Sequence, residues 1–241
     1  MKKILLGFIA IGLLTFVGCG TKKNEGSGVT DVDGNTYQSV IIGTQEWMSE
    51  NLDVGHFRNG DIVPEVKTEE EWRKAGDEKR PAWCYYNNDS SNGEKYGKLY
   101  NWYAVSDPRG LAPNDWHVST DGEWTVLTDY LAADGHSGKQ GKALKATSSW
   151  DNKNDGTSGN GTDNYGWNGL PGALRGLKGF TYGGYFNDFG SYGFWWSSSQ
   201  NDIGTAWSRH LVYYSDRVSR DSSWESKSSK NYGFSVRCLR D

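Results

Sequence analysis

Tryptophan and tyrosine have to form most of the core of this chain. The 241 residues include 12 Trp and 14 Tyr, whereas hydrophobic residues make up only 35% of the sequence. A buried aromatic side chain removes roughly 150–250 Å² from water, so a few of them replace many aliphatic residues. The 32 Gly residues are nearly double the usual share of about 7% and indicate many turns. We therefore expect one loop-rich domain with short regular elements.

The first 18 residues are typical of a secretion signal and are set apart from the fold. Residues 1–3 are basic, and residues 4–17 form an apolar run that is shorter than the about 20 residues of a membrane-spanning helix. The run ends in Phe16-Val17-Gly18-Cys19, which resembles a bacterial lipobox. This resemblance implies cleavage before Cys19 and its acylation, so that lipid chains anchor the protein in a membrane. Ordinary cleavage with Cys19 as a bystander is the alternative.

Residues 19–28 are expected to be the acylated cysteine and a flexible polar tether. Gly20 stands where an Asp would resemble an inner-membrane retention signal, so we expect the outer membrane of the cell envelope, with the leaflet left open. Loss of the signal removes Lys2 and Lys3 and changes the net charge from −4 to about −6. This acidic balance argues against nucleic acid as the partner, because phosphate binding needs a basic surface.

Two cysteines remain in the domain, Cys84 and Cys238. An even number in an exported protein favours a disulfide, which would stabilise the fold by about 4–5 kcal/mol in the chain-entropy model. Two buried free thiols and a two-cysteine metal site are the alternatives. The four histidines, at positions 56, 117, 136 and 210, show no ligand spacing, and His117 is expected to be packed or hydrogen-bonded. No metal or other cofactor is predicted.

Local patterns predict short helices in the first half of the chain and strands toward its end. Asp33-Gly34 is typical of the turn of a hairpin over residues 29–42. Thr120 and Glu123 form a capping box before a helix over residues 121–131. A further helix is expected over residues 97–105, and strands near residues 194–199, 207–213 and 234–238. This order predicts the α+β class.

Several motifs occur along the chain in an order that resembles one protein family. They are Trp83-Cys84-Tyr85-Tyr86-Asn87-Asn88-Asp89, Tyr96-Gly97-Lys98-Leu99-Tyr100-Asn101-Trp102-Tyr103-Ala104-Val105, Trp116-His117-Val118, Glu123-Trp124, Leu170-Pro171-Gly172, residues 190–198 and Gly233-Phe234-Ser235-Val236-Arg237-Cys238. Together they resemble the Fibrobacter succinogenes major paralogous domain over residues 29–241. The resemblance implies a C-type lectin-like fold, nearest to the formylglycine-generating-enzyme branch, in a bacterial lipoprotein. No activity follows, since fold alone is a weak guide to function.

The segment between the last two predicted strands has the composition of a recognition surface. Tyrosine and tryptophan supply rigid contact area, while Ser, Asp and Arg supply adaptable hydrogen bonds. We expect a polysaccharide or protein ligand to be bound by Tyr213, Tyr214, Asp216, Arg217, Arg220 and Trp224. Residues 197–232 also have the composition that a diversity-generating retroelement produces, so the segment is a candidate for diversification. Strand aromatics such as Trp195 and Trp207 more simply fill the core.

No catalytic residue is predicted, because nucleophile-elbow, zinc-helix, P-loop and dinucleotide motifs are missing from the sequence. Formylglycine-generating enzymes hold copper with a cysteine pair near the C-terminus, where this chain has only Cys238. The resemblance to this branch makes a metal-dependent oxidase the rival hypothesis, against which the missing second cysteine counts. A structural envelope protein is the third hypothesis. Asp151, Asp155 and Asp163 offer oxygen ligands for calcium within residues 151–164, although a solvated polar loop is the ordinary interpretation.

Overall fold

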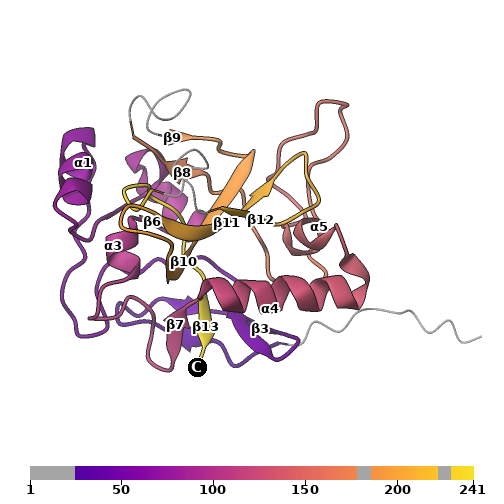
Figure 1. The fold of residues 1–241 in the computed structure, drawn as a ribbon, viewed down its shortest axis with the longest axis horizontal. Coiled ribbons are helices and arrows are strands. Elements are labelled where there is room, and N and C mark those ends of the chain that lie inside the picture. The colour runs from indigo at the N-terminus through magenta and orange to yellow at the C-terminus, as the bar shows by residue number, and fades with distance from the viewer. Residues whose placement is uncertain (1–24, 178–185, 222–228) are drawn as a thin grey trace, which may run out of the picture.

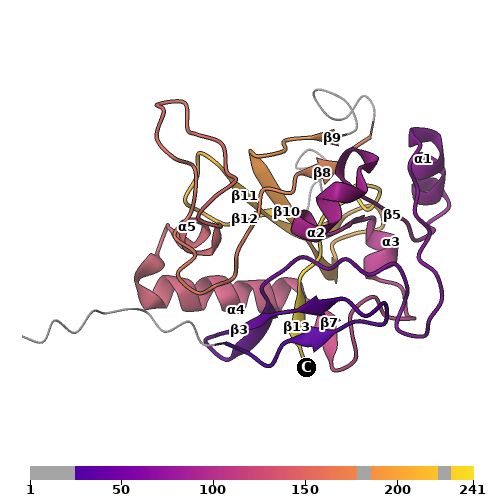
Figure 2. The same cartoon turned by 180° about the vertical axis from the view of Figure 1, so that it is seen from behind.

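Two antiparallel sheets organise the computed structural model, which describes residues 25–177, 186–221 and 229–241 (Figures 1 and 2). One sheet has the strand order β3-β4-β13-β7 and the other has the order β10-β11-β12. The first consists of β3 (Ser39–Ile42), β4 (Gln45–Met48), β7 (Trp116–Val118) and β13 (Cys238–Arg240). The second consists of β10 (Tyr192–Gln200), β11 (Ala206–Val212) and β12 (Ser219–Asp221).

Short ladders and helices fill the space around these sheets. The ladders pair β1 (Val29–Thr30) with β2 (Thr36–Tyr37), β5 (Trp83–Cys84) with β6 (Leu99–Tyr100), and β8 (Leu174–Arg175) with β9 (Phe186–Asn187). The helices are α1 (Glu69–Asp77), α2 (Gly93–Tyr96), α3 (Trp102–Val105), α4 (Asp121–Leu131) and α5 (Gln140–Leu144). Helical turns are η1 (Tyr86–Asn88), η2 (Ser90–Asn92) and η3 (Ala132–His136). Named strands pair antiparallel throughout the described residues, and the expected α+β class is confirmed.

The last strand of the chain lies in the middle of the four-stranded sheet. Leu239 of β13 pairs with Trp47 of β4 on one side and with His117 of β7 on the other. Residues far apart in sequence therefore meet in one sheet, at the lower end of the molecule in Figure 1. The start of the described chain lies there too, because Glu25 forms a bridge with Val40 of β3.

Helix α4 begins and ends where its sequence signals predict. The Thr120 side chain accepts a hydrogen bond from the Glu123 amide, and the Glu123 side chain accepts one from the Thr120 amide, so the capping box is confirmed. The helix buries its apolar side chains in one cluster with residues of β3, β4, β10 and β11: Val40, Ile42, Trp47, Trp124, Leu127, Leu131, Trp195 and Leu211.

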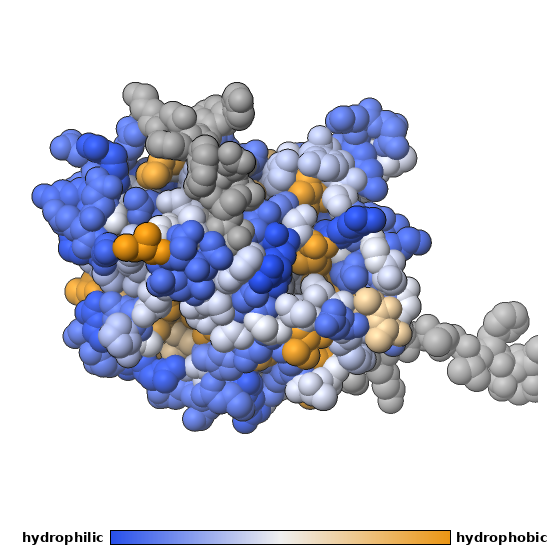
Figure 3. All heavy atoms as spheres, in the orientation of Figure 1, coloured by the Kyte–Doolittle hydropathy of each residue, from blue (hydrophilic) through white to orange (hydrophobic). Residues whose placement is uncertain are grey.

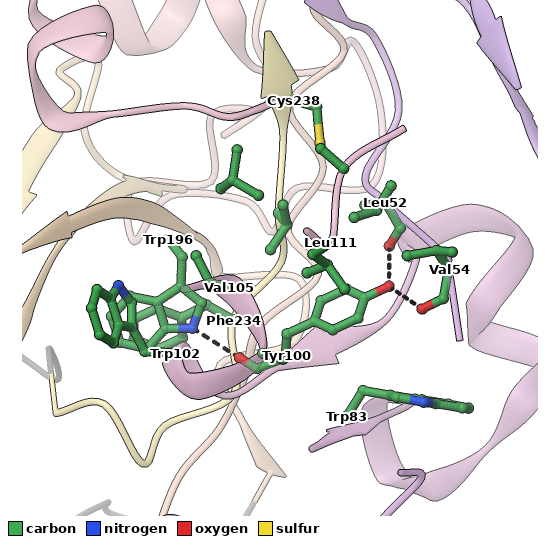
Figure 4. Close-up of a cluster of buried hydrophobic side chains, with 14 of the residues drawn as sticks. Leu52, Val54, Trp83, Tyr100, Trp102, Val105, Leu111, Trp196, Phe234 and Cys238 are labelled. Carbon is green, nitrogen blue, oxygen red and sulfur yellow. Dashed lines mark hydrogen bonds between the residues drawn. The ribbon is translucent and has the colours of Figure 1, made fainter. Parts of the chain in front are cut away.

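Aromatic side chains form the core, as their numbers predict. Trp47, Trp124, Trp167 and Trp195 meet at tilted and edge-on angles, with ring centroids between 5.0 and 6.4 Å apart, which are favourable geometries for aromatic pairs. The second large cluster surrounds Tyr100 (Figure 4).

Tyr100 satisfies its polar atoms inside that cluster. Its hydroxyl donates to the carbonyl oxygen of Val54 at 2.7 Å, and its carbonyl oxygen accepts from Trp196 Nε1 at 2.8 Å. Burial of these polar groups costs little because each has a partner.

Two expected elements differ in the structure. Residues 97–105 form β6 followed by α3 rather than one helix, because Gly97 has a φ of 68° and Asn101 caps α3 with its side chain. Residues 234–237 form only isolated bridges, such as the one between Tyr100 and Phe234, and the regular strand begins at Cys238.

The predicted disulfide between Cys84 and Cys238 is wrong, because both residues are free, buried thiols. Cys84 pairs with Leu99 in the β5-β6 ladder, whereas Cys238 pairs with Val118 in the four-stranded sheet. They belong to separate hydrophobic clusters. Burial raises the pKa of the Cys84 thiol to about 11 and also raises the pKa of Cys238.

The signal segment, Cys19 and the tether up to residue 24 lie outside the described residues. Within the part of the chain that the structure describes, no helix has the length and apolar composition needed to cross a bilayer.

Candidate functional site

Four of the predicted recognition residues, Tyr213, Tyr214, Asp216 and Arg217, lie in the connection between β11 and β12, and Arg220 lies on β12. Tyr214 is exposed, with 56% of its surface open to solvent. Tyr213 is half-buried, and its hydroxyl donates to Asn154 Oδ1 at 3.2 Å. The two tyrosine rings meet edge to face, with centroids 5.1 Å apart. Tyr213 therefore supports the orientation of Tyr214, which faces solvent.

The backbone beneath these tyrosines is fixed by lysines of the α5 region. The buried Lys145 donates from Nζ to the carbonyl oxygens of Val212 and Ser215, at 3.1 and 3.0 Å. Burial lowers the pKa of Lys145 to about 8. The amide of Lys142 donates to the carbonyl oxygen of Asp216 at 3.0 Å. These bonds hold the segment from both ends.

The polar loop of residues 151–164 packs against the same segment. Lys153 forms an ion pair with Asp216 at 3.6 Å, and a bridge between Asn152 and Ser158 closes the loop on itself. Asp151 accepts a hydrogen bond from Ser191 at 2.5 Å. The loop is thus a second wall of the candidate surface.

The loop carboxylates that were candidates for calcium each have a local partner. Asp155 accepts from Thr157 and Asp163 accepts from the Asn168 amide. Across the described ranges, no group of three His, Cys, Asp or Glu side chains is placed to hold a metal ion.

The two arginines of the segment play different parts. The Arg217 side chain is exposed and has no ion pair with a described residue. Arg220 lies over the ring of Trp207, with its guanidinium carbon 3.4 Å from the centroid, and forms an ion pair with Asp121 at 2.8 Å. Arg220 therefore joins β12 to the start of α4, and its charge is already compensated.

Trp224, the remaining predicted contact, lies outside the described residues. The buried Arg209 shares the Asp121 carboxylate with Arg220, at 2.7 Å. This shared carboxylate lowers the conformational freedom of β11 and β12 next to the site.

The prediction from sequence missed Tyr192. Its ring lies between the exposed Tyr214 and the buried Phe194 and contacts both. Tyr192 lies edge-on to Tyr214 at 6.5 Å and stacks on Phe194 at 5.6 Å, and Phe194 stacks on Phe234 at 5.0 Å. Burial and a hydrogen bond with Tyr214 raise the pKa of Tyr192. The alternation of Tyr192, Phe194 and Trp196 along β10 is the signal that could have revealed this row.

The surface around the site is polar, with separate apolar spots rather than one apolar patch (Figure 3). A polar surface that exposes single aromatic rings is typical of paratopes and of other adaptable recognition surfaces.

The comparison with known families agrees with the order of motifs. Residues 40–240 match the Fibrobacter succinogenes major domain. The chain belongs to this family. No curated protein and no solved structure matches it. In this Fibrobacter succinogenes major domain, the matched range includes both sheets, the loop of residues 151–164 and the segment of residues 213–220.

Proposed function

We propose that this protein is a cell-envelope lipoprotein, anchored through an acylated Cys19 in the outer membrane, whose domain binds a polysaccharide or a protein. The binding surface comprises Tyr213, Tyr214, Asp216 and Arg217 with the adjoining residues of the 151–164 loop. In this proposal the domain has a C-type lectin-like fold, in which loops on a rigid β scaffold contact the ligand.

The exposure of Tyr214 on a fixed backbone is the observation that carries this proposal. Tyr214 is 56% exposed, while Lys145 holds the chain directly after it at Ser215. A preorganised aromatic side chain binds a ligand without a large loss of conformational entropy. The exposed Arg217 adds a donor that no ion pair occupies within the described residues.

The arrangement of the sheets supports the anchored orientation. In Figures 1 and 2, the β11-β12 end lies on the other side of α4 from β3, β13 and β7. The described chain starts beside β3. A lipid on Cys19, six positions before Glu25, would be within about 20 Å of that sheet, since a residue spans at most about 3.3–3.6 Å. The tyrosine surface would then face away from the bilayer.

Diversification by a retroelement is a further hypothesis, and the burial pattern limits the positions at which residues 197–232 could vary. Within residues 197–232, Ala206, Ser208, Arg209 and Leu211 are buried, so random changes there would damage packing. Only outward positions such as Tyr214 and Arg217 tolerate variation. A nearby reverse transcriptase gene with a template repeat is the expected genomic sign, and its absence would remove this hypothesis.

The experiment that tests binding is a glycan and envelope-protein array probed with the full chain. We expect the double variant Tyr214→Ala, Arg217→Ala to lose capture with an unchanged melting temperature. Val126→Ala, at an exposed position of α4, is the matched control and should bind normally. Capture that survives in the double variant would refute the assignment of this surface. Loss of membrane attachment in Cys19→Ala tests the anchor separately.

A further inference from the structure

A hollow separate from the tyrosine surface lies where β7, α3 and the start of α4 approach one another. Its volume is about 430 Å³, which is within the range of about 300–1,000 Å³ for small-molecule sites. A smaller hollow of about 110 Å³ shares Arg58, Leu111 and Ala112 with it. The lining of the larger hollow contains apolar side chains and a polar rim: Val105, Leu111, Ala112 and Val118, with Arg58, Ser106, Asp107, His117, Thr120 and Ser198.

Arg58 is fixed at the boundary between the two hollows. Its Nε donates to the carbonyl oxygen of Ala112 at 3.2 Å, and its Nη2 donates to those of Pro113 at 3.0 Å and Trp116 at 2.7 Å. All three acceptors are uncharged. No carboxylate of the described residues pairs with Arg58. Its Nη1 donates no hydrogen bond to a described residue, because all three bonds come from Nε and Nη2. The guanidinium is therefore held in place with its charge uncompensated and two donors unused.

The other charged rim residue on that side, Asp107, is already neutralised. Arg109 donates from Nε to Asp107 Oδ1 and from Nη2 to Asp107 Oδ2, each at 2.8 Å. This two-pronged contact lowers the pKa of Asp107 and occupies both carboxylate oxygens. Asp107 therefore does not supply the missing counter-charge for the neighbouring guanidinium.

His117 also has carboxylate partners, one at each ring nitrogen. Its Nε2 lies 2.8 Å from Glu123 Oε1 and its Nδ1 lies 2.6 Å from Asp241 Oδ1. Both partners are carboxylates, so the arrangement favours the protonated ring, which donates from both nitrogens. The hydrogen bond with Glu123 is the main cause that raises the pKa of His117. Arg109 and His117 thus each have carboxylate partners, whereas Arg58 has none among the described residues.

We propose that this hollow binds a small organic carboxylate, with its charged end on Arg58 Nη1 and its body on Val105, Leu111 and Val118. A guanidinium is the cation whose geometry suits a carboxylate best. The immobilised side chain loses little entropy when the ligand binds. Ser198 donates its hydroxyl proton to the Val118 carbonyl oxygen at 3.0 Å, which leaves its oxygen as an acceptor for a ligand hydroxyl. This site is separate from the tyrosine surface.

The apolar floor distinguishes an organic carboxylate from an inorganic anion. Phosphate would meet the guanidinium alone, whereas a carbon skeleton would also cover the small part of Val105, Leu111 and Val118 that still faces the hollow. An acidic sugar and an apolar acid share the carboxylate chemistry. D-glucuronate and benzoate therefore serve as the two probes, with glucose and inorganic phosphate as controls.

The test is isothermal titration calorimetry of the full chain in a non-ionic detergent, with near-UV circular dichroism as the check on folding. We expect one of the two carboxylates to bind with a dissociation constant in the millimolar range, and glucose and phosphate to bind at least about tenfold more weakly. Arg58→Gln should raise the dissociation constant of the carboxylate at least about tenfold. Arg73→Gln, at an exposed arginine of α1 outside both the hollow and the tyrosine surface, should leave carboxylate binding unchanged.

A second variant keeps the test valid if Arg58→Gln fails to fold. Ser106 is exposed on the rim, so Ser106→Trp fills the hollow without removing any bond of Arg58, and binding should disappear. The proposal is overturned if neither carboxylate binds up to about 50 mM, if phosphate or glucose binds equally well, or if Ser106→Trp binds normally. Failure of this test leaves the tyrosine surface untouched, because the array experiment concerns different residues.

Discussion

Lys145 Nζ donates to the carbonyl oxygen of Ser215 at 3.0 Å, from a position 70 residues earlier in the chain. The same ammonium donates to the carbonyl oxygen of Val212 at 3.1 Å, so one buried lysine holds the chain on both sides of the half-buried Tyr213 and the exposed Tyr214. The nearest carboxylate that acts on its charge is that of Asp216. The position of the candidate binding surface therefore depends on a residue that never touches solvent.

Replacement of Lys145 by Met is expected to loosen the tyrosine segment. Two buried carbonyl oxygens lose their donor, which costs about 1–3 kcal/mol. Amide hydrogen exchange at residues 213–217 should accelerate, and urea denaturation should show the loss of stability. Lys142→Met is the matched control, because only the amide of Lys142 contacts the segment and its side chain is exposed. Unchanged exchange in Lys145→Met would contradict the role of this lysine.

Because His117 lies between two carboxylates, we expect the free energy of unfolding to depend on pH. The pKa of His117 is raised above its ordinary 6.5, chiefly by the hydrogen bond with Glu123. The folded state thus binds the proton more tightly, and the contribution is complete below pH 6.5 and lost as the pH rises through the raised pKa. The loss is modest because a third of the side chain is exposed, at 34%.

Urea denaturation at pH 5.5 and 8.5 checks this sign, with His117→Gln as the reference. We expect the free energy of unfolding of the wild type to exceed that of the variant by more at pH 5.5 than at pH 8.5. The pKa of Glu123 is lowered from 4.5, so its own contribution changes only below this window. A difference that grows toward pH 8.5 would show that the ring is not held as a cation.

Replacement of Arg220 should lower the stability of the fold, whereas replacement of Arg217 should leave the stability nearly unchanged. Arg220→Ala removes the contact with Trp207 and one ion pair of Asp121, which together are worth about 1 kcal/mol at an exposed site. Arg217→Ala has no such contact and should change the free energy of unfolding by less than about 0.5 kcal/mol. Chemical denaturation of both variants measures this contrast. Equal effects would mean that Arg217 has a structural partner.

Arg237 is expected to be far less replaceable than any surface arginine. It is fully buried and donates to Asn51, Met48, Trp167 and Asn168 at distances between 2.6 and 3.0 Å. Arg237→Met removes all four of these hydrogen bonds, although Asn51 Oδ1 keeps the one from Trp195 Nε1, and should cost more than about 3 kcal/mol. Arg237→Lys should rescue only part of this, because one ammonium does not reproduce the guanidinium fork. Near-native melting of Arg237→Met would refute the argument.

The two free cysteines should not react with a thiol reagent in the native protein. Both are fully buried, and burial raises their pKa values, to about 11 for Cys84. Reaction requires the thiolate. Ellman's reagent should therefore label Cys84 and Cys238 only after unfolding. Intact mass under non-reducing conditions is the second measurement, and a mass lower by two hydrogens would instead reveal the bridge.

Elements with a local cause were predictable, whereas those with a distant cause were not. Thr120 and Glu123 predict the start of α4 because a capping box is complete within four residues. The exposure of Tyr214 followed from its polar neighbours. The supports of the site depend on residues brought together by the fold: Lys145 beneath Ser215, and Tyr192 beside Tyr214. No local pattern contains that information.

The same reason explains the wrong disulfide and the missed hollow. An even number of cysteines says nothing about which sheets carry them, and Cys84 and Cys238 are separated by the pairing of β13 with β7. Arg58 gave no sequence signal, because its importance comes from the carbonyl oxygens of residues 112–116.

Because Cys84 and Cys238 remain thiols, no covalent bond between side chains joins the two halves of this domain. Its native packing then needs no oxidising catalyst, and the redox potential of the surroundings does not enter its folding equilibrium. The domain can reach the same native state in a reducing cytoplasm as in an oxidising envelope.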